Sequence, residues 1–252
     1  DESPPLLSWS PTAAKIRARV EEVLGHPINH ALIQLYRSGN DYISEHSDKT
    51  IDVVRGSNIV NVSLGAERVM ILRTKKDTLP PKDEETGQVP ERTAQRFPLP
   101  HNSMFIMGSE TNKRWLHGIR QDKREAFLKT KGEMDYDGER ISLTFRHIAT
   151  FLSADQTQIY GQGATGKAKS EAKPVINGDK DASQRMIDAF GFENQQSDFD
   201  WDATYGAGFD VLHFTNLRAD IPRKPLLYFV NGSIPSWRVK AGHDITPLQP
   251  AR

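Results

Sequence analysis

Apolar and polar residues alternate most regularly in residues 140–147, RISLTFRH. In an extended strand successive side chains point to opposite faces, so the two kinds of residue separate. The polar face carries Arg140, Ser142, Thr144 and Arg146. The apolar face carries Ile141, Leu143 and Phe145. This pattern predicts a half-buried β-strand.

Other short segments with alternating or continuous apolar character are also expected to be strands. They are residues 28–37, 41–46, 59–64, 68–73, 97–99, 103–108, 114–119, 209–214 and 225–230. Residues 59–64 and 68–73 flank Gly65-Ala66-Glu67, which predicts a hairpin. Many short strands with few helices predict a mainly β fold, a double-layered sheet or a barrel-like structure.

Two segments have helical periodicity. An apolar stripe from Ala13 to Leu24 predicts a helix that Thr12 caps and Gly25 ends. A shorter amphipathic helix is expected over 182–190, closed by Gly191. The remaining segments are predicted to be an exposed loop (78–96), a charged loop (121–138), a mobile insertion rich in Gly, Gln and Lys (154–181) and a basic tail (235–252).

The expected organisation is a single domain over 1–252. Its core would comprise residues 28–150 and strands within 205–232, with 154–204 as a long C-terminal insertion. At 252 residues the chain has ample material for one large core.

Composition narrows the class of protein. Lys plus Arg and Asp plus Glu both number 33, so only local clusters of charge could attract nucleic acid. No apolar run approaches the roughly 20 residues that span a bilayer, so no membrane partner is expected. The absence of cysteine excludes disulfides and thiolate metal sites and fits an intracellular protein of cytoplasm or nucleus. The oligomeric state stays open.

Candidate metal chemistry begins at His46-Ser47-Asp48. On extended chain an imidazole and a carboxylate two residues apart lie on the same side. With one further His they would form a 2-His-1-carboxylate site for a first-row divalent metal. A phosphate-binding loop is a weaker alternative, because Gly161-x4-Gly166-Lys167 is followed by Ala168 instead of Ser or Thr.

Four ordered blocks then carry a resemblance. They are NHALIQLYRSGNDYISEHSD (29–48), NIVNVSLGAERVMILR (58–73), LPHNSMFIMGSETNKRWLHGI (99–119) and RISLTFR (140–146). Together they resemble the AlkB branch of the Fe(II)/2-oxoglutarate dioxygenases. The resemblance implies a double-stranded β-helix (jelly roll) core with flanking helices. It also implies Fe(II), 2-oxoglutarate as co-substrate and O2.

The resemblance assigns roles to particular residues. His46, Asp48 and His117 would hold the iron. Arg140 would bind the distal carboxylate of 2-oxoglutarate, and Arg146 would lie near the metal end. Further contacts to 2-oxoglutarate would come from Tyr36, from Gln34, which replaces the family's Asn, and from Ser142, which replaces a second Asn.

The implied function is oxidative demethylation of alkylated bases in DNA or RNA, as in DNA repair. Thr50 stands where nucleobase-repair members carry an acidic residue that touches the base, and Tyr42 and Trp115 are candidate walls of a base pocket. Because of Thr50 and a short N-terminal part, oxidation of a small molecule or a protein side chain is an alternative. An inactive binding module is a third hypothesis, which the intact metal set disfavours.

Overall fold

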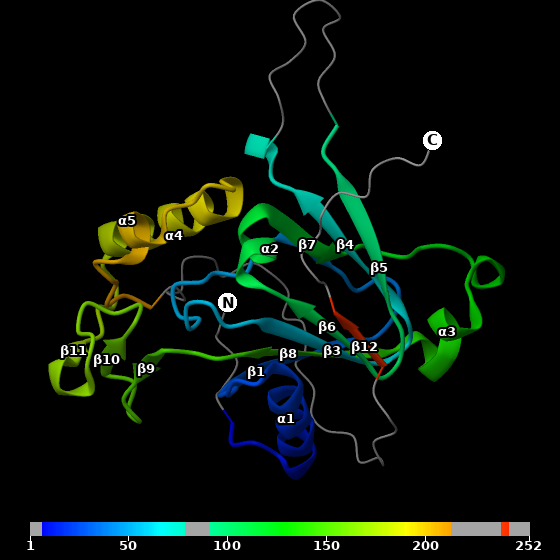
Figure 1. Cartoon of the computed structure of the whole chain (residues 1–252), viewed down its shortest axis with the longest axis horizontal. Coiled ribbons are helices and arrows are strands. Elements are labelled where there is room, and N and C mark those ends of the chain that lie inside the picture. Colours follow the sequence, from blue (N-terminus) through cyan, green and yellow to red (C-terminus); the bar gives the residue numbers. More distant parts are fainter. Residues whose placement is uncertain (1–6, 79–90, 213–237, 242–252) are drawn as a thin grey trace, which may run out of the picture.

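The structure is a computed structural model that describes residues 7–78 and 91–212 together with the backbone of 238–241. Two β-sheets dominate it (Figure 1). The five-stranded sheet has the order β1 (His30–Tyr36), β8 (Arg140–Arg146), β3 (Ile59–Gly65), β6 (Ser103–Met107) and β12 (Arg238–Ala241). The four-stranded sheet has the order β2 (Ile43–His46), β7 (Trp115–Ile119), β4 (Arg68–Thr74) and β5 (Ala94–Leu99). The expected mainly β, jelly-roll architecture is confirmed.

The alternation in β8 decides which face carries which chemistry. Its neighbour β3 is in register with it, Val62 opposite Leu143 and Ser63 opposite Ser142. The apolar residues of both strands pack outward against helix α1 (Pro11–Leu24), where Val60, Val62, Leu143 and Phe145 contact Ile16 and Val20. The polar residues therefore face the second sheet. A separate apolar cluster joins the two sheets and includes Tyr36, Met70, Leu72, Phe105 and Ile119.

Helix α1 begins earlier than the sequence pattern predicted. Its cap is Ser10, whose Oγ accepts a hydrogen bond from the backbone N–H of Ala13 at 3.1 Å. The expected cap Thr12 lies inside the helix because Pro11, with its fixed φ and no N–H, is suited to the first helical position. Gly25 ends the helix in the left-handed conformation, at φ +70°, as expected.

The predicted hairpin of residues 59–64 and 68–73 is wrong. Strand β3 pairs with β6 and β8, whereas β4 pairs with β5 and β7, so the chain crosses from one sheet to the other between them. Gly65 makes the crossing at φ +95°. A Cβ at this position would lie 2.3 Å from the Glu139 carbonyl oxygen, so both the φ value and the close approach require glycine.

The C-terminal region forms regular structure where a mobile insertion was expected. Strands β9 (Thr150–Leu152), β10 (Gln158–Gly161) and β11 (Lys173–Pro174) form a three-stranded sheet. Helices α4 (Lys180–Gln195) and α5 (Trp201–Tyr205) follow, and Gly191 lies inside α4 instead of ending a helix at residue 190. The near phosphate-binding loop is closed on itself, because Lys167 Nζ donates to the carbonyls of Gln162 and Ala164.

Short helices occupy the connections. They are α2 (Ser109–Arg114), α3 (Lys131–Met134) and the 3-10 turns Lys76–Thr78, Ala126–Leu128, Asp135–Gly138 and Lys169–Glu171. The segment predicted as a charged loop, 121–138, thus holds α3 and two of the 3-10 turns. The expected strand at 209–214 is described as far as residue 212, where the chain forms an isolated bridge between Val211 and Ile176 instead of a strand. The expected strand at 225–230 lies outside the described residues, and of the expected basic tail the structure describes only 238–241, which form β12. No helix in the described part of the chain is long and apolar enough to cross a bilayer.

Candidate active site between the two sheets

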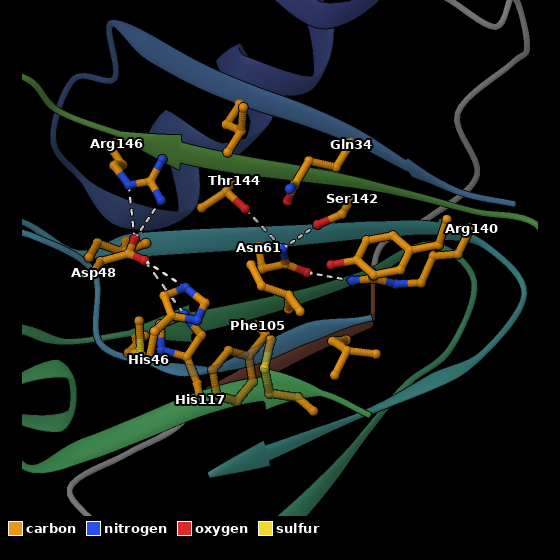
Figure 2. A pocket seen from close by; sticks show the side chains of 17 residues that line it. Gln34, His46, Asp48, Asn61, Phe105, His117, Arg140, Ser142, Thr144 and Arg146 are labelled. Atoms are coloured by element: carbon orange, nitrogen blue, oxygen red, sulfur yellow. Dashed lines mark hydrogen bonds and ion pairs between the residues drawn. The ribbon is translucent and has the colours of Figure 1, made fainter. Parts of the chain in front are cut away.

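The polar faces of β8 and β3 form one wall of a pocket between the sheets (Figure 2). The facing wall carries His46, the last residue of β2, and His117 in β7. Asp48 lies in the loop after β2 and completes the polar group at this end. Apolar side chains surround the space between the walls, including Leu32, Met70, Phe105, Met107 and Ile119.

The three predicted metal ligands meet at one end of the pocket. His46 and His117 are paired across β2 and β7, and their ring centroids are 4.4 Å apart. The Nε2 atom of each lies 3.6 Å from Asp48 Oδ1. Metal–ligand bonds of about 2.1 Å place adjacent ligand atoms about 3 Å apart. Small side-chain movements would therefore close the three groups on one ion.

Hydrogen bonds orient two of the three ligands, His46 and Asp48, so that one metal-binding atom of each faces the site. His46 Nδ1 lies 2.7 Å from the Ser44 carbonyl oxygen, which selects the tautomer with its lone pair on Nε2. Arg146 donates to Asp48 Oδ2 at 2.9 Å from Nε and 2.6 Å from Nη2, leaving Oδ1 for a metal. The Nδ1 atom of His117 is buried without a hydrogen-bond partner among the described residues.

The protonation states suit a divalent metal. Burial alone would raise the pKa of the Asp48 carboxyl, but Arg146 and the two imidazoles hold it well below its usual range. Burial lowers the pKa of His117 to about 4, so this imidazole is neutral at neutral pH. A neutral imidazole and an ionised carboxylate are the forms that bind metals. The donor set of two imidazoles and one carboxylate fits Fe(II) and leaves coordination positions open.

The opposite end of the pocket holds a buried cation without a counter-ion. Arg140 is 1% exposed, and its Nη2 donates to Asn61 Oδ1 at 2.9 Å and to Ser63 Oγ at 2.8 Å. Its Nε and Nη1 have no partner among the described residues, and no salt bridge to it forms there. Tyr36 covers the guanidinium, with its ring centroid 5.1 Å from Cζ. Burial lowers the pKa of Arg140 to about 10. These unpaired donors fit the carboxylate of an anionic ligand.

Polar residues connect the two ends. Asn61 is the centre of this network and was not singled out by the sequence analysis. Its Nδ2 donates to Ser142 Oγ at 2.7 Å and to Thr144 Oγ1 at 3.2 Å, while its Oδ1 accepts from Arg140. Gln34 also lines the pocket, from β1 on the other side of β8. The signal that could have revealed Asn61 is its place between Val60 and Val62, because a polar residue between two apolar ones points to the opposite face of the strand.

The three candidate substrate-contacting residues lie outside the pocket between the sheets. Thr50, Tyr42 and Trp115 are not among the residues that line this pocket. The Thr50 hydroxyl donates to the Glu193 carboxylate, and Thr50 borders a second cavity with Glu193 and Trp201. Tyr42 is 46% exposed, and Trp115 packs against the core between the sheets.

The three arginines between residues 114 and 124 form ion pairs within the chain. Arg124 contacts Asp122 at 2.8 Å and Glu133 at 2.5 Å. Arg120 contacts Glu45 at 3.2 Å, and Arg114 lies 3.7 Å from Glu110. Such pairs reduce the local positive field that phosphates would meet.

The two-sheet fold, the two-histidine, one-aspartate group and the buried arginine together indicate a metal-dependent enzyme with an anionic co-substrate. Comparison with known sequences identifies the family. Residues 2–146 match the model of the 2OG-Fe(II) oxygenase superfamily, which is more than half of the chain. The chain belongs to this family. Its members use Fe(II), 2-oxoglutarate and O2, the cofactors that the sequence analysis expected.

Among curated proteins the chain is similar to "DNA oxidative demethylase ALKBH2", with 34% identity to the mouse protein and 33% to the human protein. It is 30% identical to human "Alpha-ketoglutarate-dependent dioxygenase alkB homolog 3". Each match covers 56% of this chain, and 52%, 47% and 43% of those proteins respectively. The chain thus spans about half the length of the curated relatives it matches. A solved structure titled "The structure of OsALKBH1" overlaps 53% of this chain and 60% of that chain at 15% identity, with a TM-score of 0.27.

Proposed function

We propose that this protein is an Fe(II)/2-oxoglutarate-dependent dioxygenase of AlkB type that oxidatively demethylates alkylated nucleobases. One observation carries the proposal, a single pocket with a 2-His-1-carboxylate group at one end and a buried, unpaired arginine at the other. The first suits Fe(II), and the second suits the distal carboxylate of a dicarboxylic keto acid.

The residues at the two ends of the pocket would have different roles. His46, Asp48 and His117 hold Fe(II), and Arg146 keeps one oxygen of Asp48 away from the metal position. Arg140 anchors the distal carboxylate of 2-oxoglutarate and so fixes the end of the co-substrate that reaches the metal. Tyr36, Gln34 and Ser142 also line the pocket, and they would supply further polar contacts to 2-oxoglutarate.

Iron bound here would supply the reaction of O2 with 2-oxoglutarate, in which one oxygen atom enters succinate as CO2 leaves and the other hydroxylates a substrate C–H bond. Hydroxylation of an N-methyl group gives a carbinolamine, which releases formaldehyde and the free amine. The apolar residues around the pocket, such as Leu32 and Phe105, exclude water from this step.

The nucleobase is proposed because two similar proteins, mouse and human, are titled DNA oxidative demethylases. A second candidate is oxidation of a small molecule or a protein side chain. The ion-paired arginines at 114–124 favour it, because they offer phosphates a weak local field.

The test is Fe(II)-dependent formation of succinate from 2-oxoglutarate, with and without N-methylated single- and double-stranded oligonucleotides. The proposal expects succinate and formaldehyde to rise together with a methylated oligonucleotide, and His46→Ala to abolish both. Uncoupled turnover that no methylated nucleic acid changes would support the second candidate. Equal signals from wild type and His46→Ala would refute both.

A further inference from the structure

Within the described residues, the loop that carries Asp48 is held by side chains and pairs with no strand. It begins where β2 ends at His46 and runs through residues 47–50. The backbone N–H of Ser47 donates to Asn194, that of Asp48 to Asn112, and that of Thr50 to Glu193. These three side chains therefore fix the backbone from which the Asp48 carboxylate projects toward Arg146 and the two imidazoles.

Two of the three holding residues belong to helix α4. Asn194 Oδ1 accepts from Ser47 N at 2.9 Å, Ser47 Oγ at 3.3 Å and Lys49 Nζ at 3.4 Å. All three contacts use the amide oxygen, so Asn194 acts as an acceptor. Asn194 and Ser47 are 147 residues apart in the sequence.

Glu193 holds the other end of the loop. Its side chain is buried, at 3% exposure, and accepts from Thr50 N at 3.0 Å, from the Thr50 hydroxyl and from Tyr205 Oη at 2.7 Å. Trp201, at the start of α5, adds a bond from its Nε1 to the Thr50 carbonyl oxygen at 3.3 Å. Both oxygens of the Glu193 carboxylate thus accept hydrogen bonds, Oε1 from Thr50 and Oε2 from Tyr205.

Lys75 fixes the end of α4 to the core. It is fully buried, and its Nζ donates to the carbonyl oxygens of Glu193 at 2.5 Å and Gln196 at 3.1 Å. These carbonyls lie at the C-terminus of α4, where an ammonium group also interacts favourably with the helix dipole. The helix thus presents Glu193 and Asn194 to the loop from a fixed position.

We propose that helix α4 positions the metal-ligand loop, with Glu193 and Asn194 as positioning residues for Asp48. This inference rests on the proposed function in one respect only, that His46, Asp48 and His117 hold a metal. Metal affinity would then depend on a part of the chain that lies beyond the family match of residues 2–146. Outer residues that orient metal ligands typically contribute 10- to 100-fold to metal affinity.

The test measures binding of Mn(II) and Co(II) to the metal-free full chain by titration calorimetry, together with the visible spectrum of bound Co(II). Asn194→Ala is expected to weaken binding about 10- to 100-fold and to change the Co(II) spectrum. Asn194→Asp keeps the acceptor oxygen and should stay close to wild type. The control is Gln195→Ala, the next residue on α4 and exposed to solvent, which should change neither readout.

Glu193→Gln provides a second variant if Asn194→Ala does not fold. It keeps the volume but replaces one acceptor oxygen with a donor, so the two Thr50 donors and the Tyr205 hydroxyl can no longer all be accepted. Weaker metal binding is expected here too. Wild-type affinity and an unchanged spectrum in either folded variant would overturn the inference. If the wild-type protein binds no divalent metal, the proposed function fails instead.

Discussion

Replacement of Arg140 by methionine tests the co-substrate end of the pocket and predicts two effects of opposite sign. The guanidinium is 1% exposed and has two nitrogen atoms without a partner among the described residues. In the absence of ligand this buried charge destabilises the protein. In the presence of 2-oxoglutarate it forms a salt bridge with the distal carboxylate.

The size of each effect follows from the site. Burial lowers the pKa of Arg140 from 12.5 to about 10, which at about 1.4 kcal/mol per pKa unit is a cost of about 3 kcal/mol to the charged form. The variant also loses the bonds to Asn61 and Ser63, worth about 1 kcal/mol each. The ligand-free variant should thus be about 1 kcal/mol more stable than wild type. Breaking a buried ion pair costs about 3–5 kcal/mol, so 2-oxoglutarate should bind roughly 150- to 4,000-fold more weakly.

The assay combines urea unfolding without ligand and calorimetric binding of two keto acids to the Mn(II)-loaded protein. Wild type should strongly prefer 2-oxoglutarate to 2-oxopentanoate, which lacks the distal carboxylate, and Arg140→Met should bind the two about equally. Arg96→Met, which removes an exposed arginine on β5, is the control. Arg140→Met that still binds 2-oxoglutarate within about twofold of wild type would refute the reasoning.

Three further changes give definite expectations. Burial lowers the pKa of Lys75 from 10.5 to about 8 in the folded protein. The cost of burying its charge is therefore fully present below pH 8 and falls progressively as the pH rises toward 10.5. The Tm of the wild-type protein should therefore rise relative to that of Lys75→Met between pH 8 and pH 10. A Tm difference that stays constant over this range would contradict the lowered pKa. Phe145 is fully buried against α1, so Phe145→Ala should lower the free energy of unfolding by about 3–5 kcal/mol in urea titrations; a loss below about 1 kcal/mol would argue against that packing. Asp48→Asn should weaken Mn(II) binding by more than about 100-fold in calorimetry, beyond the usual loss for outer residues, and unchanged affinity would remove Asp48 from the ligand set.

Local periodicity was enough to predict the face that carries the site. In β8 the side chains of Ser142 and Arg146 had to share a face once the strand was recognised, because strand periodicity is a property of the backbone. The H-x-D spacing of His46 and Asp48 is local as well. His117 required the order of the sequence blocks, since nothing in its own surroundings marks a metal ligand.

Features that depend on non-local pairing were not predictable from the sequence. The turn at Gly65 looks the same locally whether the next strand pairs back as a hairpin or crosses to the facing sheet. The deciding factor is that β4 buries Met70 and Leu72 against the other sheet. Similarly, no local pattern connects Glu193 with Thr50, because the contact exists only after α4 has packed beside the loop.

The central claim is that one pocket couples 2-oxoglutarate oxidation to demethylation of an alkylated base. The most direct measurement is the ratio of succinate to formaldehyde released on a single-stranded oligonucleotide that carries one N-methylated base, with Fe(II) and 2-oxoglutarate supplied. Our account predicts a ratio close to one on this substrate, and loss of both products in His117→Ala. Succinate release that no methylated oligonucleotide stimulates, with no formaldehyde, would contradict it.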